Sequence, residues 1–207
     1  MFFCALLLAA CGIKPSSIVG GQQATPYSLP WQIGLVRRNG NYPVCGGTLI
    51  SDRHVLTAAH CTGIASRHDV IVGEHYTTSP DDGTRHRISR IVDHPKYNRR
   101  KTNYDFSILH LETPVQLGPR AVPACLPPSS FDNAYLNGKT MTVSGWGALC
   151  EGCGSPSRLH KVDVPGMTNA ICKNYYGNRI TNAMLCAGRN SGGVDSCQGD
   201  SGGKILH

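Results

Sequence analysis

An all-β fold is the class that this sequence predicts, on three observations. Short runs of alternating or β-rich residues recur along the chain, and its 24 glycines and 13 prolines interrupt it too often for long helices. With 207 residues and 40% hydrophobic content, the chain is long enough for one large or two small cores. No internal repeat of about 20 to 50 residues is present. We therefore expect short strands joined by turns.

Seven runs have the composition of strands. In chain order they are Trp31–Val36, Gly46–Ser51, Asp69–Glu74, Ile88–Val92, Phe106–Leu111, Met141–Gly145 and His160–Val164. Residues 111–130 carry five prolines without periodicity, which predicts a connector between two β halves. Only Thr168–Tyr176 predicts a short helix, with Thr168 as its N-cap.

The chain opens with MFFCALLLAACG, an apolar stretch that is too short to span a bilayer and has small residues near Ala10. We expect residues 1–10 to be a secretory signal peptide and the protein to be secreted to the extracellular space. The alternative is a bacterial lipoprotein box in which Cys11 is acylated. No later stretch reaches membrane-spanning length, so no membrane span is expected.

Ten cysteines in an exported chain indicate disulfides rather than reduced thiols. Loss of Cys4 with the signal leaves an odd number, so one thiol is unpaired, pairs between chains or has its partner outside this sequence. Cys150 and Cys153 form a CxxC in LCEGC. We favour a local disulfide there over a redox or metal site, because no second CxxC accompanies it.

The formal net charge of +7 raises the question of a nucleic-acid or anionic-membrane partner. Lysines and arginines are scattered, however, and only Arg99, Arg100 and Lys101 form a contiguous run. We therefore expect a basic solvated surface and no nucleic-acid partner.

Three segments carry the residue types that nucleophilic catalysis needs. Ser201 lies in GDSGG, and a serine hydroxyl needs a base to take its proton and a carboxylate to orient that base. Of the nine histidines, His60 lies in the apolar, small-residue stretch LTAAHC, pinned by Cys61, where it can be held rigidly. Asp105 in NYDFSILHL lies at the mouth of a strand, where a buried carboxylate could face His60.

TAAHC, DFSIL and GDSGG, in this order and at these intervals, resemble the chymotrypsin/trypsin family of serine endopeptidases, and the resemblance covers residues 18–203. It implies two six-stranded antiparallel Greek-key barrels, with residues 18–118 in the first and 119–207 in an incomplete second. It also implies catalytic roles for His60 as general base, Asp105 as the group that orients it and Ser201 as nucleophile.

The resemblance gives roles to four further residues. The amides of Gly199 and Ser201 would form the oxyanion hole. Asp200 would pair with the α-amine of Ile18 in IVGG after cleavage of a short propeptide, residues 11–17. Asp195, six residues before Ser201, would form the floor of the specificity pocket and select Lys or Arg.

The resemblance also implies a set of disulfides. Cys45–Cys61 would close a loop behind His60, Cys172–Cys186 would close a second loop, and Cys11–Cys125 would tether the propeptide to the body. Cys197 would pair in the family with a cysteine beyond the end of this sequence.

Two departures from the family pattern stand before the serine motif. Ser17 precedes Ile18 where a Lys or Arg is expected, so a trypsin-type activator should not cut there. The segment GEHYTTSPDDGTRHR keeps Glu74, Asp81 and Asp82 of a calcium loop but has Arg85 in place of a late carboxylate. We therefore expect no bound metal and no cofactor.

A third departure is the end of the chain, where only KILH follows GDSGG although family members continue through further strands, a pocket wall and a terminal helix. We expect the second barrel to be incomplete, and our hypothesis is a truncated or alternatively ended form that is inactive by itself.

We therefore expect a secreted endopeptidase that cuts proteins or peptides after Lys or Arg. We expect it to be monomeric and to bind protease inhibitors. The alternative is a non-catalytic homologue that acts as a binding or decoy protein. Catalytic zinc is disfavoured because no ligand spacing such as HExxH is present.

Overall fold

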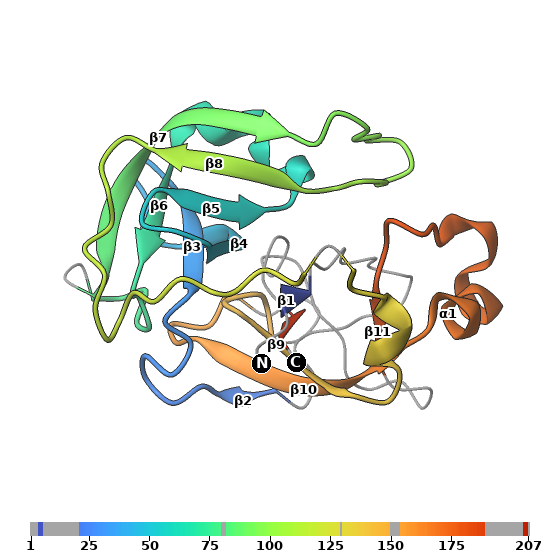
Figure 1. Ribbon diagram of the computed structural model, residues 1–207. Helices are drawn as coiled ribbons and strands as arrows, with labels where there is room; N and C mark the ends of the chain where they lie inside the picture. Colours follow the sequence, from blue (N-terminus) through green and yellow to red (C-terminus); the bar gives the residue numbers. More distant parts are fainter. Residues whose placement is uncertain are drawn as a thin grey trace.

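The structure, a computed structural model, describes residues 4–5, 21–79, 82–128, 130–149, 154–188 and 205–206. Two β units lie one above the other in Figure 1, a closed barrel above and an open sheet below. The predicted all-β class is thereby confirmed, because strands dominate both units and the described part has one short α-helix.

Six antiparallel strands of the first half close into a barrel in the order β3-β4-β5-β8-β7-β6. Their bounds are β3 Gln32–Arg37, β4 Pro43–Leu49, β5 His54–Thr57, β6 His68–Val72, β7 Thr84–Asp93 and β8 Ser107–Leu111. Side chains fill the interior of the barrel, since every second residue of a strand points inward. Ile33, Leu35, Val55 and Leu109 are each fully buried there.

Strand β5 is the barrel strand that the sequence does not predict. Its four residues, HVLT, run directly into the apolar stretch TAAHC, so no alternation marks it as a separate element. Pairing with β4 on one side and β8 on the other fixes it as a strand. Tertiary context therefore decides this element rather than local pattern.

The second unit is a sheet in the order β1-β12-β9-β10-β11, with β2 also paired to β10, so two short strands from the start of the chain join those of its second half. The strands are β1 Cys4–Ala5, β2 Gln22–Gln23, β9 Thr140–Gly145, β10 His160–Met167, β11 Cys186–Ala187 and β12 Ile205–Leu206. Over the described residues this sheet does not close on itself, which agrees with an incomplete second barrel.

The α-helix of the described residues, α1 (Asn169–Tyr176), begins where the sequence predicts it. The hydroxyl of Thr168 accepts a hydrogen bond from the amide of Ile171 at 3.3 Å and so caps the helix. Three 3₁₀ helices accompany it: η1 Ala59–Arg67, η2 Asn133–Leu136 and η3 Gly177–Arg179. No helix of the described residues is both long and apolar enough to cross a membrane.

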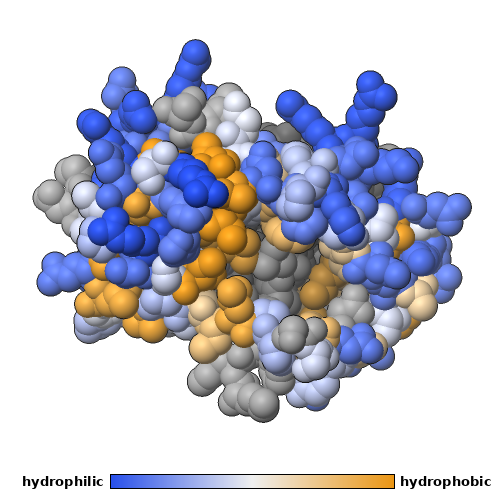
Figure 2. All heavy atoms as spheres, turned by 45° about the horizontal axis from the view of Figure 1, so that its top comes forward, coloured by the Kyte–Doolittle hydropathy of each residue, from blue (hydrophilic) through white to orange (hydrophobic). Residues whose placement is uncertain are grey.

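The connector that follows β8 has neither helix nor strand over residues 112–128, as its prolines predict. An isolated bridge between Gly118 and Ala121 is its only β pairing in that range. Leu117, Val122 and Leu126 of this segment expose large apolar side chains. On the face drawn in Figure 2, a band of hydrophobic atoms separates two groups of hydrophilic residues.

A buried polar contact joins the barrel to the open sheet. The hydroxyl of Ser144 on β9 donates to Oε1 of Gln32 on β3 at 2.8 Å, and both residues are buried. Nearby, Nε1 of Trp146 donates to the carbonyl of His75 at 3.3 Å. These bonds satisfy polar groups that would otherwise be costly to bury, so they fix how the two units meet.

Candidate active site

The pairing of β5 with β8 brings two predicted site residues together. Thr57 at the end of β5 lies opposite Ser107 at the start of β8. His60 follows Thr57 by three residues, and Asp105 precedes Ser107 by two. Because the strands are antiparallel, both segments leave the barrel at the same edge. Residues 45 positions apart in the chain thus become neighbours.

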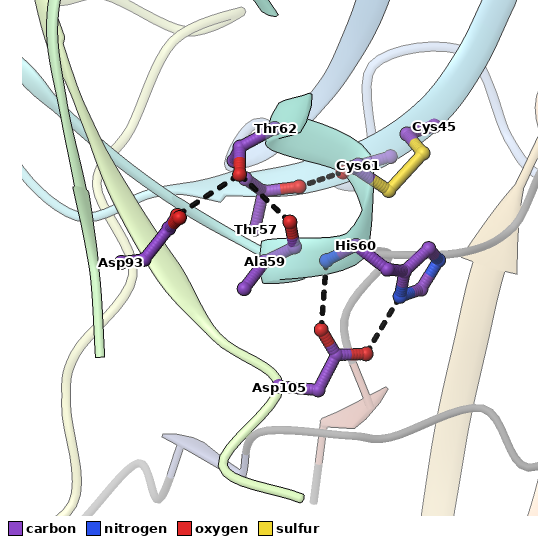
Figure 3. Close-up of polar contacts among 9 residues, drawn as sticks. Cys45, Thr57, Ala59, His60, Cys61, Thr62, Asp93 and Asp105 are labelled. Carbon is purple, nitrogen blue, oxygen red and sulfur yellow. Dashed lines mark hydrogen bonds and ion pairs between the residues drawn. A yellow bond between two sulfur atoms is a disulfide. The ribbon is translucent and has the colours of Figure 1, made fainter. Parts of the chain in front are cut away.

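His60 and Asp105 face each other in two hydrogen bonds, which Figure 3 shows. Nδ1 of His60 lies 2.6 Å from Oδ2 of Asp105, and the backbone amide of His60 donates to Oδ1 at 2.8 Å. The Asp105 side chain is 1% exposed, whereas that of His60 is 35% exposed. The carboxylate is therefore held at depth, while the imidazole reaches the surface.

This arrangement selects one tautomer of the imidazole. An ionised carboxylate can only accept hydrogen bonds, so the proton of neutral His60 is assigned to Nδ1. Nε2 then carries a free lone pair. A histidine oriented in this way can take a proton from a nearby hydroxyl and is stabilised by the buried carboxylate when it becomes charged.

The helix η1 that carries His60 is anchored to β4 and β7 through the two residues that follow His60. The disulfide Cys45–Cys61 joins it to β4, as predicted. Oγ1 of Thr62 lies 2.9 Å from Oδ1 of Asp93 on β7 and 2.7 Å from the carbonyl oxygen of Ala59 (Figure 3). Ligand-type atoms of Cys45, Cys61 and His60 lie close together, but the two sulfurs are bonded to each other and cannot hold a metal.

The loop that presents Asp105 has an unusual backbone that the sequence analysis did not anticipate. Thr102 and Tyr104 adopt φ angles of 47° and 52°, in the left-handed region that non-glycine residues rarely visit. The ring of Tyr104 stacks on His94 with centroids 4.7 Å apart. Such strain persists only where the surroundings hold it, and here the stack of Tyr104 on His94 does so.

The second half of the chain also contacts this loop. Oγ1 of Thr181 donates to Oδ1 of Asn103 at 2.6 Å, two positions before Asp105. Asn169 at the start of α1 in turn donates to the carbonyl oxygens of Thr181 and Met184, both at 3.0 Å. Nothing in the sequence pattern links these residues. They connect the Asp105 loop to the segment closed by the Cys172–Cys186 disulfide, which is also present as predicted.

Tyr97 is a half-buried neighbour, with a buried hydroxyl, that the sequence analysis missed. Among the described residues its hydroxyl has no hydrogen-bond partner. Burial raises the pKa of this phenol, and the negative charge of Asp105 raises it further. The HPKY segment that contains it carries no pattern from which this position could be read.

Residues 73–87 correspond to the calcium loop of the family. Their acidic side chains lie in different environments. Asp82 accepts hydrogen bonds from the hydroxyl of Tyr27 at 2.7 Å and from the amide of His75 at 2.6 Å. Glu74 is 6% exposed, and its Oε2 has no hydrogen-bond partner among the described residues. Burial, with the charge of Asp82 added, raises the pKa of Glu74 to about 8. Asp81 lies outside the described residues.

The remaining predicted site residues lie outside the part of the chain that the structure describes. These are Ser201, Gly199, Asp195, Asp200, Ile18, Cys11, Cys150, Cys153 and Cys197. Cys125 is exposed and has no disulfide partner among the described residues, and its pairing with Cys11 stays a prediction. The structure therefore brings His60 and Asp105 together, while the positions of their expected partners stay predictions.

Comparison with known proteins places the chain in a family. The trypsin family model matches residues 18–207. Trypsin-2 of Salmo salar is 37% identical over 96% of this chain and 82% of its own length. Serine protease 1 of Rattus norvegicus is 38% identical over 91% of this chain and 74% of its own length. The clotting factor G beta subunit of Tachypleus tridentatus is 34% identical over 95% of this chain and 68% of its own length. With the barrel and the His60–Asp105 pair, these matches show that the chain belongs to the trypsin family.

Proposed function

We propose that this trypsin-family serine endopeptidase is secreted and cleaves peptide bonds after Lys or Arg through an acyl-enzyme intermediate. The observation that carries the proposal is the His60–Asp105 pair, with Nδ1 and Oδ2 2.6 Å apart and the carboxylate buried. The buried carboxylate orients Nδ1 of His60 and leaves Nε2 available, which is the arrangement that a general base needs. The position of Ser201 in GDSGG supplies the expected nucleophile.

In the proposed reaction, Oγ of Ser201 attacks the carbonyl carbon of the scissile bond while Nε2 of His60 takes the hydroxyl proton. Asp105 stabilises the imidazolium that results. The amides of Gly199 and Ser201 donate hydrogen bonds to the oxyanion. His60 then gives its proton to the leaving amine, and a water molecule activated by the same histidine hydrolyses the acyl-enzyme.

Substrate choice is assigned to Asp195. A carboxylate at the floor of a desolvated pocket pairs with the cation of Lys or Arg, and an uncharged side chain would leave it unpaired. Activation is assigned to an ion pair between the α-amine of Ile18 and Asp200, formed when the segment before Ile18 is cut. Cys11–Cys125 would then keep the cut segment attached to the body.

The test is hydrolysis of a Lys or Arg ester by the protein cut before Ile18, with the Ser201→Ala variant as control. We expect turnover that the substitution lowers to background and a strong preference over aromatic or small esters. Turnover with aromatic preference would remove the role of Asp195. Tight binding of a protease inhibitor without any turnover would favour the non-catalytic alternative. The same assay on the 207-residue chain tests the hypothesis that this form is inactive by itself; the turnover expected above is that of a form with a completed second barrel.

A further inference from the structure

Two histidines lie side by side on the outer face of the barrel, away from the candidate active site. The register of β5 and β8 places His54 opposite His110. Their neighbours Val55 and Leu109 are fully buried in the barrel core. Since side chains alternate along a strand, both imidazoles point outward, and both are half-buried.

The distance between the two rings suits a shared metal ion. Their centroids are 4.6 Å apart, with the ring planes at 74°. A zinc–nitrogen bond of about 2.0–2.1 Å places each ring centre about 3 Å from the ion, so two rings on one ion have centres about 4.5–5.5 Å apart. The observed distance between the two ring centres falls within this range.

The Ser51 hydroxyl holds the ring of His54, one of the two candidate ligands. Nδ1 of His54 lies 2.7 Å from the Ser51 hydroxyl oxygen, which also accepts from the amide of Arg53 at 3.1 Å. When Nε2 binds a metal, Nδ1 carries the proton and donates to this oxygen. Metal-binding histidines in proteins are commonly held by such a hydrogen bond to the second ring nitrogen.

The charges around the pair both favour and oppose a cation. Burial, with the neighbouring His54 and Arg90 added, lowers the pKa of His110. Arg90 on β7 lies opposite His110 and repels a cation. Its side chain is exposed, however, so solvent and salt screen this repulsion.

We propose that His54 and His110 form a surface site for a divalent transition metal of the zinc type, with water in the remaining positions. Imidazole suits Zn²⁺, Ni²⁺ and Cu²⁺ better than it suits Ca²⁺ or Mg²⁺. The ion would link β5 to β8, the strands whose ends carry His60 and Asp105. The ion would hold this pair of strands in register. The proposal of a metal site does not rest on the proposed peptidase activity.

The experiment is calorimetric titration of the whole protein with Zn²⁺, together with its variants His54→Gln and His110→Gln. We expect one site that each substitution weakens at least tenfold, and a rise in Tm with Zn²⁺ that both variants lose. The matched control is His160→Gln, a half-buried histidine of the second sheet, which should leave the affinity unchanged.

Two results would overturn the proposal. One is equal Zn²⁺ affinity in the natural protein and both variants, which would assign binding to other groups, such as other histidines of the chain. The other is the absence of binding up to about 1 mM Zn²⁺, the weakest affinity that a specific site of this kind would have. Circular dichroism of each variant checks that the fold is retained, and His54→Asn with His110→Asn repeats the comparison if either glutamine variant is unfolded.

Discussion

Asp105 is the residue on which the orientation of His60 depends most directly. Its two carboxylate oxygens bind different groups of the same residue, the ring nitrogen and the backbone amide. This double contact fixes both the rotation of the ring and its position relative to the helix η1. A side chain with only one acceptor oxygen would leave either the ring rotation or the ring position unfixed. The role therefore requires a carboxylate at this position, with both of its oxygens.

Replacing Asp105 with Asn tests this dependence. The amide keeps the shape of the side chain, but its N–H group favours the wrong tautomer of His60, with the proton on Nε2. We expect kcat to fall by about 10⁴-fold at neutral pH while the fold is retained. Ester hydrolysis and circular dichroism measure the two effects. Asp163→Asn, an exposed carboxylate bound to Thr142, is the control. A loss of only a few-fold in Asp105→Asn would contradict the role given to Asp105.

Glu74 predicts a pH dependence of stability. Because burial raises its pKa from 4.5 to about 8 in the folded protein, the folded state keeps a proton that the unfolded state releases between these values. The free energy of unfolding should therefore fall as pH rises from about 5 to 8, by a few kcal/mol at about 1.4 kcal/mol per pKa unit.

The Glu74→Gln variant isolates this contribution, since a glutamine binds no proton in either state. Urea unfolding at pH 5 and pH 8 should show a smaller decrease in stability for the variant than for the natural protein. Every other titratable group is present in both proteins, so the comparison isolates the group at position 74. An identical pH dependence in the two proteins would mean that Glu74 is ionised in the fold.

Among the secondary-structure elements, β10 shows how tightly the second half is packed despite its open sheet. Gly166 on this strand lies against the helix η2, and its backbone exchanges hydrogen bonds with residues 138 and 139. A β-carbon at Gly166 would overlap the carbonyl oxygen of Leu136 and approach Sδ of Met141 to 2.8 Å. The close approach of η2 to β10 therefore requires glycine at this position.

Gly166→Ala should lower the free energy of unfolding by about 1–3 kcal/mol, because the added methyl group has to displace backbone rather than a flexible side chain. Gly154→Ala is the matched control, since a β-carbon at that glycine meets no atom within 4 Å. Chemical denaturation of both variants measures the difference. Equal stability of the two would mean that η2 can move away from β10 at little cost.

In the molecule as a whole, the barrel and the open sheet meet across polar groups as well as apolar ones. Ser144 and Gln32 form a buried hydrogen bond between strands of the two units, and Trp146 packs with Ala24 and Leu159 beside it. The meeting of the two units also positions Thr181 against the Asp105 loop. Their relative placement is therefore coupled to the candidate active site.

Ser144→Ala tests the importance of this junction. It leaves the buried Oε1 of Gln32 without the hydroxyl donor, which should cost about 1–3 kcal/mol of stability. Thermal unfolding measures the loss. Ser28→Ala is the control, because the Ser28 hydroxyl makes an exposed local bond to the carbonyl of Thr25. A Tm unchanged in Ser144→Ala would show that water replaces the lost donor and that the junction is not sealed.

The elements that the sequence predicts correctly are those with a pattern inside one short segment. Alternation identified seven strand segments, prolines identified the connector, and Thr168 identified the helix start. The segments around His60, Asp105 and Ser201 also carry the family resemblance without any structure. These features depend on residues a few positions apart, so they can be read from the chain directly.

The sequence by itself determined the all-β class, the family and the identity of the candidate catalytic groups. Only the tertiary structure decided that HVLT is a strand, that Oε2 of Glu74 is buried without a hydrogen-bond partner among the described residues and that His54 lies against His110. Each of these depends on which distant segments become neighbours when the barrel closes. Strand register is set by the packing of the whole core, and no local pattern in the chain records it.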